Sequence, residues 1–386
     1  MNRKTVGIYI HIPFCVQKCL YCDFISGPAS HEVKKDYVEQ LLKEIELRTQ
    51  NTGLLTADTI FIGGGTPSAI DAEDICKILC KLKENFNILS DCECSIEVNP
   101  GTVDENKLKK YREAGINRLS IGLQSCNDNE LKALGRIHDF KTFEETFRLA
   151  RKAGFDNINV DLMSSIPEQT VESFEKSLQC IAGLGPEHIS VYSLIVEEGT
   201  PFYNMDLKLP SEDDERLIYH ETGRILEEYG YSQYEISNYA KSGRECKHNI
   251  RYWKCNEYMG FGLAAASYFN GVRRKNTENI NQYIKHMKKS SSEFDLQSED
   301  FYSEKEELTS KDQYAEFMFM GLRMNEGISK KEFINRFGIS MDEIYGDVIR
   351  THIQNGLLAA EGERIHLTRR GRDISNYVMA DFIILE

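Results

Sequence analysis

Short apolar runs alternate with amphipathic stretches along the first 230 residues. Six of these runs are rich in β-branched and aromatic residues and are followed by Gly, Pro or Asn, which is typical of strands that end in turns. The six predicted strands are 6–13, 59–63, 94–98, 118–124, 157–163 and 188–196. Six strand–helix units in series predict a parallel sheet with right-handed crossovers, either an open sheet or a partial barrel.

The stretches between these runs carry apolar residues at helical spacing. Gly115 and Gly154 stand where glycines commonly end helices, directly after segments that contain Lys and Arg. The segments predicted as helices are 33–47, 71–87, 106–114 and 142–153. In either sheet architecture, functional residues are expected beyond the carboxyl ends of the strands.

The pattern changes after the sixth unit. Residues 290–307 are Ser-rich and acidic, which predicts an exposed connector. Helical stretches at 314–322 and 330–337, followed by a hairpin around 361–363, resemble a winged-helix module. This segment offers few basic residues, so a small packing domain is favoured over a nucleic-acid-binding domain. The predicted division is a barrel core at 1–231, a closing segment at 232–289, an acidic linker at 290–311 and a helical domain at 312–386.

Composition narrows the function classes. The chain has 47 basic and 61 acidic residues, a net charge of −14, which argues against general affinity for nucleic acid or anionic membranes. It has no apolar run near the ~20 residues of a membrane helix, and residues 1–5 carry no apolar signal core. A cytoplasmic location is therefore expected. Thiols stay reduced there, so the eleven cysteines predict metal ligands and buried apolar groups rather than disulfides.

Three cysteines directly follow the first predicted strand. Cys15, Cys19 and Cys22 are spaced four and three residues apart, which suits one loop wrapped around a metal centre. Structural zinc usually takes four protein ligands in two paired groups, and a second pair does not follow at finger spacing. A four-iron cluster would be capped by three thiolates at three irons, which leaves one iron open to a small molecule.

The other predicted strand ends carry residues that suit a cofactor site. Glycines 63–65 precede Thr66, and glycine allows a backbone to approach a ligand closely. Glu97 and Asp161 stand at the ends of the third and fifth strands. Each could be a structural polar group when taken alone. Their placement at successive strand ends predicts one shared site.

The cysteine loop, with Tyr21 before the third cysteine and Phe24 after it, resembles the radical S-adenosylmethionine superfamily. The resemblance implies a partial (β/α)6 TIM-like barrel in the α/β class, with a small C-terminal helical, winged-helix-like domain. It also implies a [4Fe–4S] cluster on Cys15, Cys19 and Cys22, whose open iron chelates the amino and carboxylate groups of S-adenosylmethionine.

The motifs at residues 9–15, 63–66, 97–100, 122–125 and 161–163 resemble the subgroup that contains oxygen-independent coproporphyrinogen III oxidase. By this resemblance, Tyr9, Gly64 and Glu97 contact the cluster-bound S-adenosylmethionine. The segment 260–266, which ends at Ala266, is expected to close the site. The positions that match contacts to a second S-adenosylmethionine are Tyr21, Gly65, Thr66, Gln124, Arg136 and Asp161.

Two features separate this chain from the oxidase. Phe24 stands where the oxidase pattern has a fourth cysteine, and the run His248-Asn249-x-x-Tyr252-Trp253 resembles the signature of haem chaperones. An imidazole can ligate haem iron and the two aromatic rings offer flat faces, although a core aromatic pair with a hydrogen-bonded histidine would look the same.

The resemblance implies a haem chaperone that binds haem and delivers it to apo-proteins, with an electron donor such as a flavodoxin or ferredoxin. The alternatives are the oxidase activity, by radical decarboxylation, and a zinc-bound structural protein. Ser165 and Glu168 depart from the pattern, because the family usually has glycine there. Both positions follow Asp161, which the resemblance assigns to the second S-adenosylmethionine.

Overall fold

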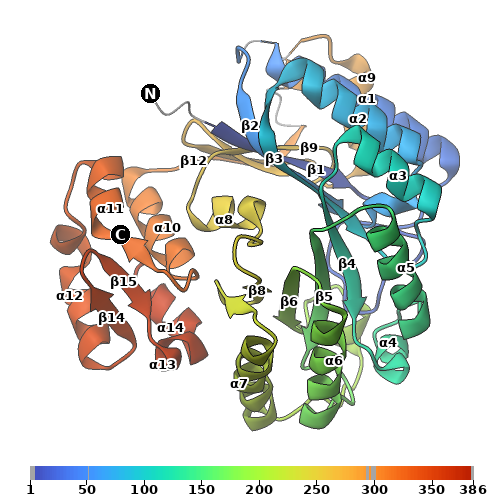
Figure 1. Cartoon of the computed structure of the whole chain (residues 1–386). Helices are drawn as coiled ribbons and strands as arrows, with labels where there is room; N and C mark the ends of the chain where they lie inside the picture. The colour runs from blue at the N-terminus through green and yellow to red at the C-terminus, as the bar shows by residue number, and fades with distance from the viewer. Residues whose placement is uncertain (1–4, 51, 293–294, 297–300, 384–386) are drawn as a thin grey trace.

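The computed structural model describes residues 5–50, 52–292, 295–296 and 301–383. Residues 1–4, part of the segment expected to carry no signal core, lie outside the described residues. Six parallel strands form the centre of an open, curved sheet (Figure 1). They confirm the six predicted strands with shifted ends. They are β1 (Thr5–Ile12), β2 (Thr56–Gly64), β3 (Asn87–Val98), β4 (Arg118–Gln124), β5 (Ile158–Ser164) and β6 (His188–Ser193).

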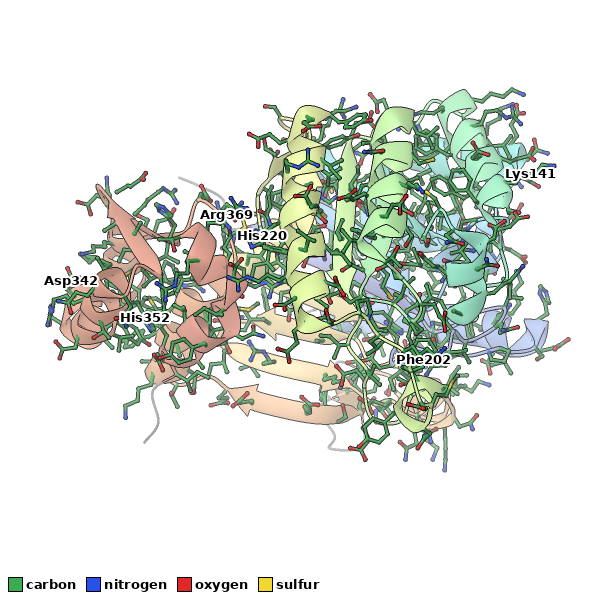
Figure 2. All side chains as sticks on the ribbon, turned by 90° about the horizontal axis from the view of Figure 1, so that it is seen from below. Lys141, Phe202, His220, Asp342, His352 and Arg369 are labelled. Atoms are coloured by element: carbon green, nitrogen blue, oxygen red, sulfur yellow. The ribbon has the colours of Figure 1, made fainter. Side chains whose placement is uncertain are left out.

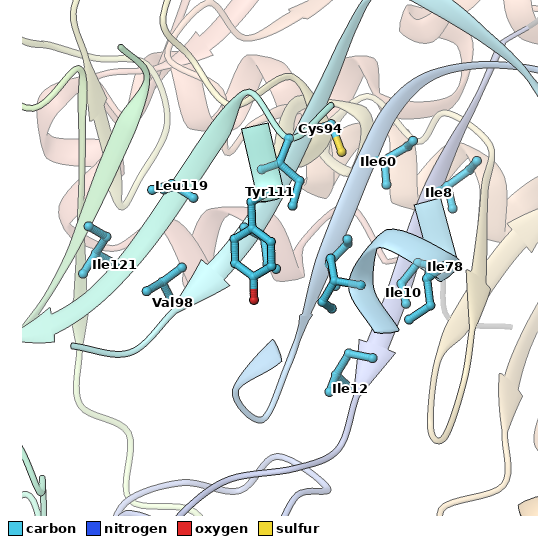
Figure 3. Close-up of a cluster of buried hydrophobic side chains, with 14 of the residues drawn as sticks. Ile8, Ile10, Ile12, Ile60, Ile78, Cys94, Val98, Tyr111, Leu119 and Ile121 are labelled. Atoms are coloured by element: carbon cyan, nitrogen blue, oxygen red, sulfur yellow. The ribbon is translucent and has the colours of Figure 1, made fainter. Parts of the chain in front are cut away.

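Helices cover the outer face of this sheet (Figure 1). Isoleucines 8, 10 and 12 of β1 are fully buried between sheet and helices, as Figure 3 shows, and each stabilises the fold by ~1.5–3 kcal/mol relative to exposure. Alternate residues of β1 point to the inner face instead. The covering helices are α1 (His31–Thr49), α2 (Ala72–Asn85), α3 (Glu105–Ala114), α4 (Asp128–Ala133), α5 (Phe140–Lys152), α6 (Val171–Leu184) and α7 (Glu212–Glu228).

Short strands extend both edges of the sheet. At one edge, β8 (Asn238–Ala240) and β7 (Ser232–Gln233) follow β6. At the other, β9 (Tyr258–Phe261) pairs parallel with β1, and β10 (Ala266–Phe269), β11 (Val272–Asn276) and β12 (Tyr302–Glu307) follow in antiparallel order. The helices of this region are α8 (Lys247–Trp253) and α9 (Ile280–Lys289).

The prediction of an acidic connector over 290–311 is wrong for its second half. Strand β12 lies there, and its acidic residues face the basic residues of β11: Glu306 lies opposite Arg273 and Glu304 opposite Lys275. Opposite charges across an antiparallel pair stabilise the strand. The side chains are exposed as predicted, but the backbone is part of the sheet. Residues 293–294 and 297–300 of the expected connector lie outside the described residues.

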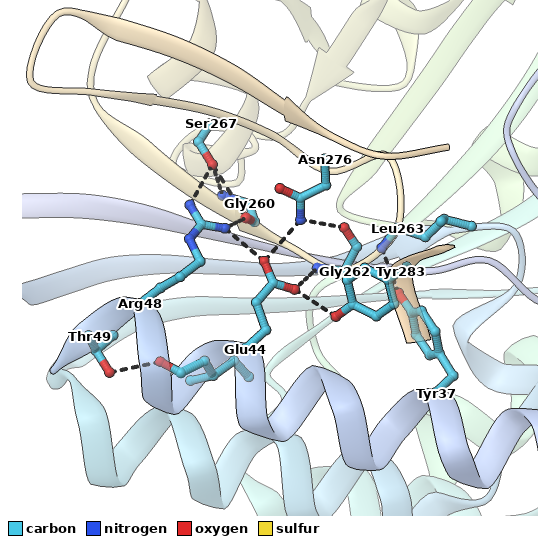
Figure 4. A network of polar contacts seen from close by, with 11 residues as sticks. Tyr37, Glu44, Arg48, Thr49, Gly260, Gly262, Leu263, Ser267, Asn276 and Tyr283 are labelled. Carbon is cyan, nitrogen blue, oxygen red and sulfur yellow. Dashed lines mark hydrogen bonds and ion pairs between the residues drawn. The ribbon is translucent and has the colours of Figure 1, made fainter. Parts of the chain in front are cut away.

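A buried ion pair fastens α1 to the β9–β11 segment (Figure 4). Glu44 Oε1 lies 2.9 Å from Arg48 Nη1, and both side chains are almost fully buried. Glu44 also accepts hydrogen bonds from Gly262 N (2.8 Å) and Tyr283 Oη (2.7 Å), while Arg48 donates to Ser267 Oγ (3.1 Å). These contacts hold the segment between β9 and α9 against the first helix of the chain.

The C-terminal domain has its own core, in which Phe317, Phe333 and Ile365 are buried. It confirms the predicted helices and hairpin. Its elements are α10 (Ser310–Gly321), β13 (Ile328–Ser329), α11 (Lys330–Phe337), α12 (Met341–Gln354), β14 (Leu358–Glu361), β15 (Arg364–Leu367), α13 (Arg369–Asp373) and α14 (Ser375–Ala380). Arg369 Nη2 lies 3.1 Å from His220 Nδ1 of α7 at the junction with the barrel (Figure 2).

Ser165 and Glu168, which stand where the family usually has glycine, carry backbone strain. Their φ angles are 59° and 65°, a left-handed conformation that is unfavourable for residues other than glycine. The left-handed backbone that glycine favours is therefore kept at both positions without glycine.

In the described part of the chain, no helix is long and apolar enough to cross a membrane.

Candidate functional site

The cysteine loop is closed at its base by backbone hydrogen bonds. Cys15 N donates to Gly27 O and Gly27 N donates to Pro13 O, each at 3.0 Å. Cys15 is buried, and Cys19 and Cys22 are half-buried. All three thiols line one cavity of about 560 Å³ at the carboxyl ends of the parallel strands. The sequence prediction that these cysteines share one site is consistent with this arrangement.

Two of the three thiol sulfurs accept hydrogen bonds from side chains that line the same cavity. Thr66 Oγ1 donates to Cys15 Sγ and Arg136 Nη1 donates to Cys19 Sγ, both at 3.5 Å. Such donors suit thiolates, the form of cysteine that binds metals. Among the described residues, no three His, Cys, Asp or Glu side chains are gathered closely enough to hold a single metal ion. Three thiols that line one cavity, two of them with hydrogen-bond donors, suit the three protein-bound irons of a [4Fe–4S] cluster.

The glycines after β2 bring bare backbone to the same cavity. Gly64 has φ of +117°, and a Cβ there would meet the His11 ring at 2.7 Å. A Cβ on Gly65 would meet Cys15 Sγ at 2.9 Å. Close packing therefore requires glycine at both positions, as the sequence indicated, and both glycines line the cavity.

Two carboxylates face the same cavity. Glu97 accepts a hydrogen bond from Gly64 N at 3.0 Å, and burial together with the charge of Asp161 raises the pKa of Glu97 to about 8. Asp161 accepts from Ser120 Oγ (3.1 Å) and Asn159 Nδ2 (2.7 Å), and burial raises its pKa as well. A cationic ligand group would stabilise both ionised carboxylates.

The structure brings together nearly all residues expected at the S-adenosylmethionine site. Gln124 holds φ of 78°, a strained conformation of the kind found at functional sites. Ala266 is the exception, because it lies on β10 and lines a different cavity. The expected residues that do line the cavity with the three cysteines are Tyr9, Tyr21, Gly64, Gly65, Thr66, Glu97, Gln124, Arg136 and Asp161.

A second cavity of about 530 Å³ lies beside the first. Its walls come from the cysteine loop, from α8, from strands β9–β11 and from α10 of the C-terminal domain, and they include several aromatic rings. Tyr9, Asp23, Phe24 and Tyr252 line both cavities and so form their common wall. Residues that line the second cavity alone include Trp253, Cys255, Tyr258, Ala266, Tyr268 and Met320.

The residues expected to bind haem divide between the two cavities. His248 and Asn249 line the first, Trp253 lines the second, and Tyr252 lines both. His248 is buried and both ring nitrogens are occupied: Nδ1 lies 2.9 Å from Thr59 Oγ1 and Nε2 lies 2.8 Å from Tyr252 Oη. Burial lowers its pKa to about 3. The imidazole is therefore neutral and serves to hold Tyr252 in place.

Sequence reasoning missed several polar residues of the first cavity. Arg118 is 2% exposed and lies at the start of β4, where a charged residue in an apolar run was the available signal. Asn99 stands inside the motif at 97–100 but was given no role, and Asn159 has no signal of its own, because a single amide in a strand is common. Their partners lie tens of residues away: Arg136 donates to Asn99, and Asn159 donates to Ser120.

Comparison with known proteins agrees with this geometry. The profile of the Radical SAM superfamily matches residues 9–181, and that of the HemN C-terminal domain matches residues 308–374. The structure resembles coproporphyrinogen III oxidase (HemN) from Escherichia coli with a TM-score of 0.84, at 24% identity, over 99% of this chain and 90% of that one. This second likeness shows the fold alone. The superfamily match implies a [4Fe–4S] cluster and S-adenosylmethionine as cofactors.

Curated relatives match over the full length. The haem chaperone HemW of Bacillus subtilis (strain 168) is 38% identical over 382 residues, which cover 97% of this chain and 98% of that protein. HemW of Lactococcus lactis (strain IL1403) is 35% identical over 389 residues, which cover 100% of this chain and 99% of that protein. Together with the cysteine loop and the C-terminal domain, these matches show that the chain belongs to the radical SAM superfamily and, within it, to the HemW family of haem chaperones.

Proposed function

We propose that the protein is a haem chaperone in which the cluster and haem occupy neighbouring cavities. The observation that carries this proposal is the common wall of Tyr9, Phe24 and Tyr252 between the cysteine-lined cavity and the aromatic cavity. A [4Fe–4S] cluster would be held by Cys15, Cys19 and Cys22. Haem would lie in the second cavity and would be delivered from there to apo-proteins.

S-adenosylmethionine would lie in the first cavity, where a reduced cluster can cleave it to a radical. Glu97 and the backbone at Gly64 would hold its amino group or ribose, since a buried carboxylate with a raised pKa gains most from a cation beside it. Asp161 and Gln124 line the same cavity and suit hydroxyl or amide partners.

Haem suits the second cavity because its walls combine flat rings with basic residues. Trp253, Tyr258 and Tyr268 supply apolar faces, and Arg273 and Lys275 supply cations for propionate groups. Both basic residues are held in place, since Arg273 pairs with Glu316 (2.7 Å) and Lys275 with Glu278 (2.6 Å). His248 would act on haem through Tyr252 rather than bind iron itself, because its ring nitrogens are occupied.

Protein partners would approach the mouth of the first cavity. Several exposed apolar side chains lie in the cysteine loop or beside residues of the first cavity: Val16 and Phe24 are each 61% exposed, Ile137 is 59% exposed and Ile195 is 69% exposed. Exposed apolar residues of this kind are typical of interaction sites. It suits an electron donor such as a flavodoxin or ferredoxin, or a haem-receiving apo-protein. All eleven cysteines are unpaired, which suits a reducing compartment such as the cytoplasm.

Haem transfer tests the proposal. Anaerobically reconstituted protein is loaded with one equivalent of haem, passed through a desalting column and mixed with apo-myoglobin. The Soret band is expected to move to the myoglobin position, and the chaperone should keep its cluster. Failure to retain any haem on the column would refute the proposal.

The oxidase activity is not expected. Phe24 occupies the position of the fourth cysteine of the oxidase pattern and lines both cavities. An anaerobic assay with coproporphyrinogen III, S-adenosylmethionine and a reductant should give no protoporphyrinogen. Clear turnover would favour the oxidase. Iron and sulfide analysis of the same preparation separates a cluster from zinc.

A further inference from the structure

A continuous chain of hydrogen bonds connects two of the three loop cysteines. Thr66 Oγ1 donates to Cys15 Sγ at 3.5 Å and Arg136 Nη1 donates to Cys19 Sγ at 3.5 Å. Asn99 joins these two donors: its Nδ2 donates to Thr66 Oγ1 at 2.8 Å, and its Oδ1 accepts from Arg136 Nη2 at 2.9 Å. The chain therefore runs from one thiol to the other through three side chains.

The direction of each bond is fixed by chemistry. A guanidinium only donates, so the oxygen of the Asn99 amide must face Arg136 and its nitrogen must face Thr66. The nitrogen occupies a lone pair of the Thr66 hydroxyl, which leaves the hydroxyl proton free to point at Cys15. Arg136 is held further by donating from Nη2 to Gly122 O at 2.7 Å, which leaves Nη1 directed at Cys19.

Asn99 is itself held by neighbouring residues. Its backbone nitrogen donates to Ser68 Oγ at 3.2 Å, and Ser68 is fully buried. Most buried chains of hydrogen bonds end on other polar groups. A chain that ended in this way would serve packing alone. This chain ends on sulfur at both sides, and a thiol is a weak acceptor whereas a thiolate carries a full charge. Both ends therefore suit cysteines in their iron-bound form.

We propose that Asn99 is a positioning residue that directs two hydrogen-bond donors at the cysteine ligands of the cluster and thereby raises its reduction potential. This inference rests on the cluster of the proposed function. Donors to the sulfurs stabilise the extra negative charge of the reduced cluster, and such bonds are one of the protein's means of setting the potential. Asn99 acts on Cys15 through Thr66 and on Cys19 through Arg136.

The test is a redox titration of cluster-loaded protein without S-adenosylmethionine, followed by electron paramagnetic resonance. With Asn99→Ala, the ratio of reduced to oxidised cluster at a fixed potential should fall about tenfold, equal to ~59 mV for a one-electron couple. Asn117→Ala is the matched control, because the Asn117 side chain also makes two hydrogen bonds but does not line the cavity of the cluster. Its midpoint should equal that of the wild type.

A second pair of variants tests the Thr66 end separately. Thr66→Val removes the hydroxyl at nearly constant volume, and Thr66→Ser keeps it. The valine variant should have the lower potential and the serine variant the wild-type potential. Equal potentials in this pair, or an unchanged potential in Asn99→Ala with full cluster content, would overturn the inference. If Asn99→Ala takes up no cluster, the Thr66 pair alone decides. Wild-type protein without a cluster would instead refute the cluster in the proposed function.

Discussion

The two cavities share one wall but are assembled in different ways. The first lies at the ends of β1 to β5, and most of its polar groups already hold one another by hydrogen bonds, as Glu97 and Gly64 do at 3.0 Å. The second collects residues from the cysteine loop, from 252–278 and from α10, and its walls combine aromatic rings with charged side chains. The first is therefore preorganised for a polar, charged cofactor, and the second for a flat ligand that carries charged groups.

The largest expected effect is the loss of cluster uptake with little change in haem affinity. Replacing Cys15, Cys19 and Cys22 together by Ala should abolish cluster uptake, because the cluster loses all of its protein ligands. Haem affinity should change less than about threefold, equal to ~0.7 kcal/mol, because the second cavity is intact. Iron and sulfide analysis measures the first quantity and a Soret titration the second. Loss of both together would contradict separate sites.

The next largest effect is on the stability of the β9–β11 segment, which lines the second cavity and is fastened to α1 by the Glu44–Arg48 pair. Glu44→Ala should lower the free energy of unfolding by about 3–5 kcal/mol, because it leaves Arg48 buried without its partner. Glu172→Ala is a matched control, since the Glu172–Lys176 pair has the same helical spacing but is exposed, and little change is expected. Urea unfolding followed by circular dichroism compares the two variants. Equal losses would show that the buried pair does not fasten this region.

Trp253 and His248 should differ in what they affect. Trp253→Ala should weaken haem binding about tenfold, or ~1.4 kcal/mol, and Trp253→Phe should retain most of the affinity because it keeps a flat face. His248→Ala should instead cost about 1–3 kcal/mol of stability, because Thr59 and Tyr252 each lose a buried partner. A larger effect of His248 than of Trp253 on haem affinity would contradict the assignment of haem to the second cavity.

The smallest effect is a pH dependence in the first cavity. Burial and Asp161 raise the pKa of Glu97 from 4.5 to about 8, so the folded apo-protein holds this proton more tightly than the unfolded chain does. Its contribution to stability is fully present below about pH 4.5 and is lost as the pH rises through 8. The Glu97→Gln variant cannot ionise at this position, so it does not lose this stability as the pH rises.

The stability of Glu97→Gln relative to the wild type should therefore increase by about 1–3 kcal/mol between pH 5 and pH 9. Urea unfolding of apo-protein at these two pH values measures the difference. A difference that does not change with pH would show that Glu97 ionises freely in the folded protein.

The difference between the cavities also explains what the sequence could predict. The residues of the first cavity follow consecutive strands, and the ends of parallel strands meet at one edge, so glycines 63–65, Glu97 and Asp161 could be placed together in advance. The second cavity depends on contacts between segments far apart in the chain, which periodicity does not report. Ala266 was accordingly expected at the first cavity, whereas it lines the second.

Pairings between distant residues account for the other misses. The acidic segment before α10 becomes strand β12 because β11 presents basic residues opposite it, and its own composition indicates only exposure. The network of Glu44 and Arg48 joins α1 to residues more than 200 positions away. The parallel order of β1 to β6 was predictable because each strand and its covering helix are local in sequence.

A haem titration of cluster-loaded protein, with and without S-adenosylmethionine, tests the central claim most directly. Separate cavities predict saturable binding of one haem per chain, an unchanged cluster content and the same haem affinity with and without S-adenosylmethionine. Absence of saturable binding would contradict the proposed function. Competition between haem and S-adenosylmethionine, or loss of the cluster as haem binds, would show that the two ligands occupy one cavity rather than two.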